Sequence, residues 1–105
     1  MAASVAFYTT LGFETVYGGP DERFTSLSIG TSPATNFVNL QLTGQPPGTG
    51  WGRVIFHVDS PDDVHATALA NGYPASTEPA DAPWGERYFH IYDPDGHELS
   101  FARRL

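Results

Sequence analysis

Hydrophobic residues in the first part of the chain follow one helical and three extended patterns. Between Ser4 and Leu11 the apolar positions recur at helical spacing, and Gly12 supplies a stop signal. Three extended segments follow and are separated by turn-rich runs: Phe13–Tyr17, Phe24–Ile29 and Phe37–Leu42. The pattern therefore predicts a helix followed by three strands.

The second part of the chain begins after residues 43–50, a run rich in Pro and Gly that predicts a linker. Apolar and polar residues alternate over Trp51–Val58, which is typical of a strand. Ser60 and Pro61 then predict the N-cap and first position of a helix that runs to about Ala70. We expect this half to open with a strand and a helix.

Beyond that helix the pattern becomes extended again. Residues 73–77 predict a short strand, and a Pro-rich loop follows at 79–83. From Trp84 to Ala102 the pattern predicts a β-hairpin, with strands at Arg87–Tyr92 and His97–Ala102 joined by the turn sequence DPDG. We expect this hairpin to close one end of a small-molecule cleft.

The two parts of the chain form an internal repeat of about 60 residues. LGF at 11–13 aligns with NGY at 71–73, and NLQL at 39–42 aligns with ELSF at 98–101 with one residue of slippage. Each half then has the pattern strand, helix and three strands, but the opening strand of the first half is missing. Either the recorded start is late, which we favour, or that sheet position is left open or filled by a partner chain.

Length and composition fit one folded domain. With 105 residues we expect a single domain over 1–105, divided into an N-terminal module at 1–42, the linker at 43–50 and a C-terminal module at 51–105. Apolar residues make up 40% of the chain, which is enough for a core. The absence of cysteine excludes disulfides, thiolate metal sites and cysteine nucleophiles, and it fits a reducing cytosol.

The formal net charge is −7, from 12 acidic and 5 basic residues, and every basic residue is an arginine. A nucleic-acid binder needs clustered positive charge, so we expect no nucleic-acid partner. The acidic field favours a cationic or neutral ligand; the alternative, which we favour, is that the charge only keeps the protein in solution. No apolar run reaches the roughly 20 residues that span a bilayer, and no signal peptide opens the chain. We therefore expect a cytoplasmic protein without a membrane partner.

Four phrases of the sequence occur together in one protein superfamily. They are SVAFYTTLGFETVYGG at 4–19, NLQL at 39–42, RVIFHVDSPDD at 53–63 and PWGERYFHIYDPDGHELSFA at 83–102. In this order and spacing the chain resembles the vicinal-oxygen-chelate superfamily, also called the glyoxalase/bleomycin-resistance/dioxygenase superfamily. Its bleomycin-resistance-type and glyoxalase-like members are the most similar. The resemblance implies an α+β fold of paired βαβββ modules, which form a curled mixed sheet around a cleft and commonly assemble as a homodimer.

The same resemblance implies where a metal would bind. Metal-dependent members place one ligand on the first and one on the last strand of each module. The first position falls in the missing strand, and the others fall on Gln41, Arg53 and Ser100. Divalent metals prefer imidazole or carboxylate ligands, whereas arginine is always a cation and serine is a poor neutral ligand. We therefore expect no metal cofactor in the cleft.

A histidine could form a metal site elsewhere in the cleft only if a second ligand lay close enough to bind the same ion. Strand alternation places His57 on the cleft face with Arg53, and Glu98 on the cleft face with Ser100. His57 lies four residues beyond Arg53, and Glu98 lies two residues before Ser100. The resemblance thus puts His57 and Glu98 about six residues apart on parallel strands, roughly 20 Å, which one ion cannot bridge.

Eight residues are expected to line the ligand site: Gln41, Arg53, His57, Trp84, Tyr88, His90, Glu98 and Ser100. Inside a cleft Arg53 needs an anion, either Glu98 or a ligand carboxylate or phosphate. His57 could act as an acid or base, or it could simply hydrogen-bond to a neighbour. Trp84 offers a flat surface for a planar or cationic ligand, or it closes the end of the barrel.

Three functional hypotheses remain open, and no catalytic residue is identified. The first, which we favour, is a binding protein that takes a small aromatic or cationic molecule in a metal-free cleft, with Tyr88 and His90 as aromatic walls. The second is a metal-dependent glyoxalase-like lyase or dioxygenase whose site needs the missing strand. The third is a non-catalytic interaction domain.

Overall fold

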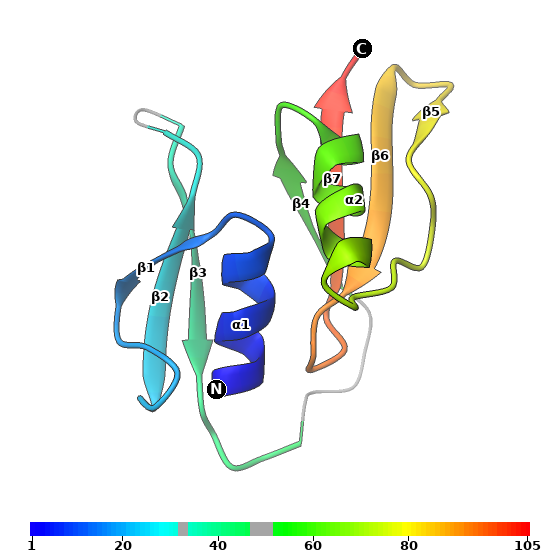
Figure 1. The fold of residues 1–105 in the computed structure, drawn as a ribbon. Helices are drawn as coiled ribbons and strands as arrows, with labels where there is room; N and C mark the ends of the chain where they lie inside the picture. The colour runs from blue at the N-terminus through cyan, green and yellow to red at the C-terminus, as the bar shows by residue number, and fades with distance from the viewer. Residues whose placement is uncertain (32–33, 47–51) are drawn as a thin grey trace. The chain divides into compact units, whose positions relative to one another are not determined.

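A computed structural model describes residues 1–31, 34–46 and 52–105 of the protein. These residues contain two helices and seven strands, which confirms the predicted α+β class. They form two compact units, Met1–Pro47 (unit 1) and Gly48–Leu105 (unit 2). Each unit has one sheet and one helix (Figure 1). Neither helix is long and apolar enough to span a membrane.

Unit 1 consists of helix α1 and an antiparallel sheet in the order β1-β2-β3. The elements are α1 (Ala2–Thr10), β1 (Glu14–Tyr17), β2 (Phe24–Ile29) and β3 (Asn36–Gln41). The predicted bounds of β2 are confirmed, and the others differ by one or two residues. The local pattern of apolar and polar residues therefore predicts the helix and the strands of this unit to within two residues.

The core of unit 1 is built from aromatic rings on and after α1. The Tyr8 ring meets the rings of Phe7 and Phe13 edge-on, at centroid distances of 5.2 and 5.1 Å. All three side chains are buried, as is Leu27 of β2. Such edge-to-face pairs add to the gain from burial, so they hold the end of α1 against the chain that enters the sheet.

A buried polar contact fixes the loop between β1 and β2. The Thr25 hydroxyl donates to the Gly19 carbonyl at 2.8 Å and accepts from the Gly19 N–H at 3.1 Å. Thr25 is fully buried, and Gly19 is buried too. Gly18 has a φ of +76°, and a Cβ there would collide with the Phe24 carbonyl oxygen. Only glycine fits this close approach, which brings Gly19 onto Thr25.

Unit 2 has a mixed sheet in the order β4-β7-β6-β5. The elements are β4 (Arg53–His57), α2 (Pro61–Ala70), β5 (Ala80–Ala82), β6 (Glu86–Tyr92) and β7 (Glu98–Arg104). Strand β4 runs parallel to β7, and the other pairs are antiparallel. The predicted hairpin is confirmed as β6 and β7, with bounds shifted by one or two residues. Trp51 and residues 47–50 of the predicted linker lie outside the described residues.

The strand predicted at 73–77 is wrong. The short strand of this region is β5 at Ala80–Ala82, inside the predicted loop, and it pairs with β6. Ser76 and Thr77 instead meet β6 irregularly: the Ser76 N–H donates to the His90 carbonyl at 2.9 Å, and the His90 N–H donates to the Thr77 hydroxyl at 2.8 Å. Pairing with a distant strand, not local propensity, thus positions β5.

Helix α2 begins and ends as its sequence predicts. The Ser60 hydroxyl accepts from the Asp63 N–H at 3.2 Å, and Pro61 follows at the first helical position. Both helices end before a glycine with positive φ, Gly12 at +103° and Gly72 at +81°. The next residue then donates its N–H back into the last turn in both cases. This shared ending agrees with the predicted alignment of residues 11–13 with 71–73.

The core of unit 2 lies between α2 and one face of the sheet, which we call the α2 face (Figure 1). The Phe101 ring of β7 lies 5.5 Å from that of Phe56 and 5.6 Å from that of Phe89. His65 of α2 meets the Phe89 ring edge-on at 5.1 Å. Phe89 and Phe101 are fully buried, so this ring stack anchors β4, β6 and β7.

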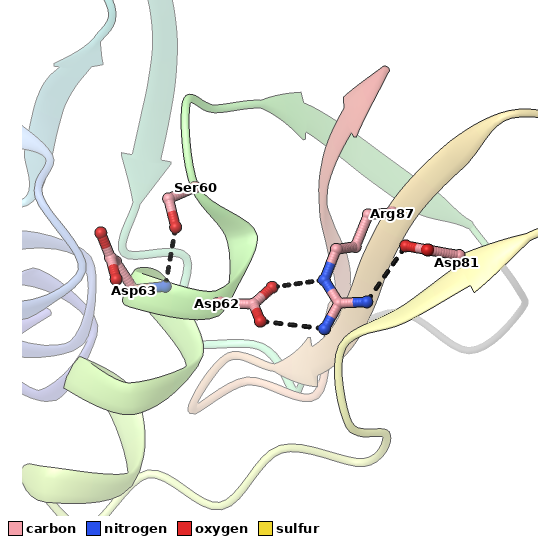
Figure 2. A network of polar contacts seen from close by, with 5 residues as sticks. All are labelled: Ser60, Asp62, Asp63, Asp81 and Arg87. Atoms are coloured by element: carbon pink, nitrogen blue, oxygen red, sulfur yellow. Dashed lines mark hydrogen bonds and ion pairs between the residues drawn. The ribbon is translucent and has the colours of Figure 1, made fainter. Parts of the chain in front are cut away.

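An arginine network ties α2 to the sheet edge (Figure 2). Arg87 of β6 donates to both Asp62 carboxylate oxygens, at 2.7 and 2.9 Å, and to an Asp81 oxygen at 3.0 Å. The hydrogen bonds from Arg87 hold the pKa of Asp62 below its ordinary value of 3.8. The network joins α2, β6 and β5 through one side chain.

Candidate functional site

Six of the predicted site residues share the face of the unit 2 sheet that lies opposite the α2 face. The register pairs Arg53 with Glu98 and His90 with Ser100. Because side chains alternate along each strand, and Phe89 and Phe101 point to the α2 face, their neighbours point the other way. We call this the site face, and it carries Arg53, His57, Tyr88, His90, Glu98 and Ser100.

Three rings form a ladder along β6 on the site face. The Trp84 ring stacks on Tyr88 at 5.8 Å with 24° between the planes, and the Tyr88 ring lies 4.9 Å from that of His90. Trp84 is 65% exposed, so its outer face is free to meet a ligand. The ladder offers a planar guest one wide aromatic surface.

A carboxylate connects this ladder to β4. The Trp84 indole N–H donates to one Glu86 oxygen at 2.9 Å, and the other Glu86 oxygen lies 3.3 Å from His57 Nε2. His57 therefore has a hydrogen-bonding neighbour, as one of its two predicted roles requires. The contact also fixes the indole ring, because its only polar atom is engaged.

Arg53 and Glu98 form an ion pair, with 2.8 Å between Nη2 and Oε1. Arg53 lies opposite Glu98 rather than Ser100, and His57 lies opposite Ala102. The predicted offset between His57 and Glu98 is therefore wrong: they are four residues apart, about 13 Å along the strands. One metal ion still cannot bridge them.

His90 has an unusual environment. Its Nδ1 atom is buried and has no hydrogen-bond partner among the described residues. Burial lowers the pKa of His90 below 6.5, the nearby Arg53 charge lowers it further, and Glu98 partly opposes this. Its cross-strand neighbour Ser100 is also buried. The Nδ1 atom of a neutral His90 imidazole can therefore still form a hydrogen bond, for example with a ligand.

Gln41 lies in unit 1, at the end of β3, where it pairs with Phe24 of β2. It is exposed, on the face of its sheet opposite the buried Leu27. Of the eight predicted residues, Gln41 thus lies in unit 1, six lie on the site face, and Trp84 stacks on Tyr88 beside that face.

The turn between β6 and β7 holds a group whose two aspartates the sequence predicted only as part of the DPDG turn. Ligand atoms of Asp93, Asp95 and His97 all lie within 4.8 Å of one another, so the group could hold a metal ion. One Asp93 oxygen accepts the N–H groups of Asp95 and His97, and the other lies 2.8 Å from His97 Nδ1. This group is evidence against the expectation that the protein binds no metal cofactor. Its signal in the sequence is the alternation of Asp, Asp and His over five residues.

The positions that the resemblance gives for a metal do not fit one. Arg53 brings a positive charge that is already paired with Glu98, and Ser100 supplies only a buried hydroxyl. A divalent cation would have to displace the guanidinium and would gain one weak neutral donor in return.

A family model described as the Glyoxalase/Bleomycin resistance protein/Dioxygenase superfamily matches residues 1–101. The chain belongs to this superfamily. Its fold agrees with that of solved members. A superfamily member from Sphaerobacter thermophilus is 27% identical, with a TM-score of 0.69 over 95% of this chain and 85% of that one. No curated protein matches the chain.

Two further solved structures are similar. TioX from Micromonospora is 25% identical, with a TM-score of 0.69 over 91% of this chain and 82% of that one. Lactoylglutathione lyase from Agrobacterium tumefaciens is 20% identical, with a TM-score of 0.72 over 96% of this chain and 83% of that one. The likeness to the lyase concerns the fold, because chemistry depends on the site residues and not on the fold.

Proposed function

We propose that this superfamily member is a small-molecule binding protein that takes a planar aromatic or cationic ligand on the site face without a metal ion. In this proposal the hairpin of β6 and β7 closes one end of the ligand cleft, and the chain acts as a cytoplasmic homodimer. The observation that carries the proposal is the exposed Trp84 ring stacked on Tyr88.

The geometry of Trp84 favours a planar guest. Its ring is already ordered by the hydrogen bond to Glu86 and by stacking on Tyr88, so little conformational freedom is lost on binding. The same arrangement favours a positive charge, because the Glu86 carboxylate lies beside the indole and the whole chain carries −7. A cation on the face of a tryptophan gains about 0.5–2 kcal/mol.

Fluorescence titration tests this proposal. In W51F, Trp84 is the only tryptophan, so quenching by metal-free bleomycin or by ethidium, a planar cation, reports on its ring. We expect saturable quenching, and calorimetry with W84A should show binding about 5- to 30-fold weaker, which corresponds to about 1–2 kcal/mol. W84F should retain most of the affinity.

Tyr92 provides the matched control, because it lies on β6 and on the site face as Tyr88 does, is 52% exposed and is outside the ladder. Y92A should bind within about twofold of the parent, since it removes no ring of the stack. Equal losses in W84A and Y92A, or no saturable binding of either probe, would refute a site built on Trp84.

A metal-dependent activity is the second candidate function, and the Asp93, Asp95 and His97 group favours it. Elemental analysis of purified protein distinguishes the two. We expect less than one tenth of an equivalent of zinc, nickel, iron or manganese after dialysis. One tightly held equivalent, lost in D95N, would overturn the metal-free part of the proposal, and light scattering tests the homodimer separately.

A further inference from the structure

Strand β4 leaves the sheet of unit 2 before its partner β7 ends. The last pair of this parallel ladder is His57 with Ala102, and the Val58 N–H donates to the Ala102 carbonyl at 2.9 Å. The chain then turns away to the N-cap of α2, while β7 continues to Arg104. The next bond of the ladder would run from the Arg104 N–H to Val58, and it is absent from the described residues.

The departure of β4 leaves a hollow of about 490 Å³ that is open to solvent. Its lining consists of His57, Val58, Asp59, Arg103 and Arg104. This volume falls in the range of about 300–1,000 Å³ that is usual for small-molecule sites. The hollow is distinct from the Trp84 ladder, although His57 lies at the border of both.

Neither arginine of the hollow forms an ion pair among the described residues. Strand alternation puts Arg103 on the α2 face, where its charge helps to lower the pKa of Asp62, and Arg104 on the site face. Arg53 and Arg87 form ion pairs with acidic side chains. Among the described residues, no carboxylate lies within ion-pair distance of Arg103 or Arg104. The cross-strand neighbour of Arg104 is Glu86, whose two oxygens already contact Trp84 and His57. In a chain of −7, Arg104, which has no ion-pair partner among the described residues, marks a local site for an anion.

Asp59 refines the class of anion. Asp59 also lines the hollow, and its carboxylate repels a plain anion but can accept a hydrogen bond from a hydroxyl or amino group. We propose that the hollow binds a small carboxylate with a hydroxyl or amino group on the neighbouring carbon. The Arg104 guanidinium and the Arg104 N–H hold the carboxylate, and Asp59 accepts from the neighbouring donor.

Lactate and propionate test this assignment, because they differ only in the hydroxyl group. Backbone amide NMR of the full chain should show shifts that saturate at millimolar lactate and centre on Asp59, Arg103 and Arg104. Lactate should bind about tenfold tighter than propionate, as expected for one hydrogen bond to a charged group. R104Q should bind lactate about tenfold more weakly, and R104K should fall between R104Q and the parent.

Two variants separate the hollow from general electrostatics. R23Q removes the same charge from unit 1, where Arg23 donates only to the Leu42 carbonyl, and should bind lactate as the parent does. D59A removes the acceptor and should bind propionate more tightly and lose the preference for lactate. Shifts that never saturate, equal effects of R104Q and R23Q, or a preference that survives D59A would overturn the proposal. Shifts centred on Trp84 and Tyr88 would overturn it as well, and would instead support ligand binding at the site face.

Discussion

Replacing Thr25 by valine tests how a single buried hydroxyl holds unit 1 together. Valine keeps the shape of threonine, but it can neither donate to the Gly19 carbonyl nor accept from the Gly19 N–H. Both backbone groups would then be buried without a partner, because Gly19 is buried and Thr25 is fully buried. Each unsatisfied group costs about 1–3 kcal/mol, and the added methyl returns about 0.8 kcal/mol.

The sum predicts that T25V lowers the free energy of unfolding by about 1–5 kcal/mol, centred near 3 kcal/mol. T25S keeps both hydrogen bonds and loses one buried methyl, which costs about 1 kcal/mol. For a domain whose total stability is about 5–15 kcal/mol, the difference between the variants is large. Serine should therefore be tolerated better than valine, although valine is the closer match in shape.

Urea unfolding followed by far-ultraviolet circular dichroism measures these differences. T15V is the matched control, because Thr15 of β1 is exposed and its hydroxyl makes no hydrogen bond among the described residues. T15V should stay within about 0.5 kcal/mol of the parent. If T25V proved as stable as T25S, the hydrogen bonds to Gly19 would contribute nothing and the reasoning would fail.

Three further predictions concern unit 2. S60A removes the N-cap of α2 and should cost about 1 kcal/mol in urea unfolding, whereas S60D should restore most of it; equal stability of the two variants would contradict the cap. In R87M the pKa of Asp62, followed by carboxyl NMR, should rise towards 3.8 because its hydrogen bonds are lost, and an unchanged value would contradict the network. Burial lowers the pKa of His90, so its neutral form stabilises the fold fully above pH 6.5 and this stability is lost as pH falls through the lowered value. The stability of the parent relative to H90Q should therefore shrink as pH falls from about 7 to about 5, and a constant difference would contradict the shift.

The sequence alone determined the elements that depend on local signals. The Ser60 and Pro61 start of α2, the two glycines that end the helices and the bounds of β2 follow from near neighbours in the chain. Alternation along β6 likewise separated Tyr88 and His90 from the buried Phe89, because the side-chain period of a strand is two. The superfamily could be recognised for the same reason: its phrases are turns and short strands in a fixed order.

Only the tertiary structure decided what depends on pairing between distant segments. The register of β4 against β7 puts Arg53 opposite Glu98, with which it forms an ion pair, and not opposite Ser100 as the resemblance implied. Strand β5 forms where β6 receives it, and the hollow beside Arg104 exists only because β4 leaves the ladder early. Register and strand ends are set by packing and hydrogen bonds across the sheet, which no local pattern contains.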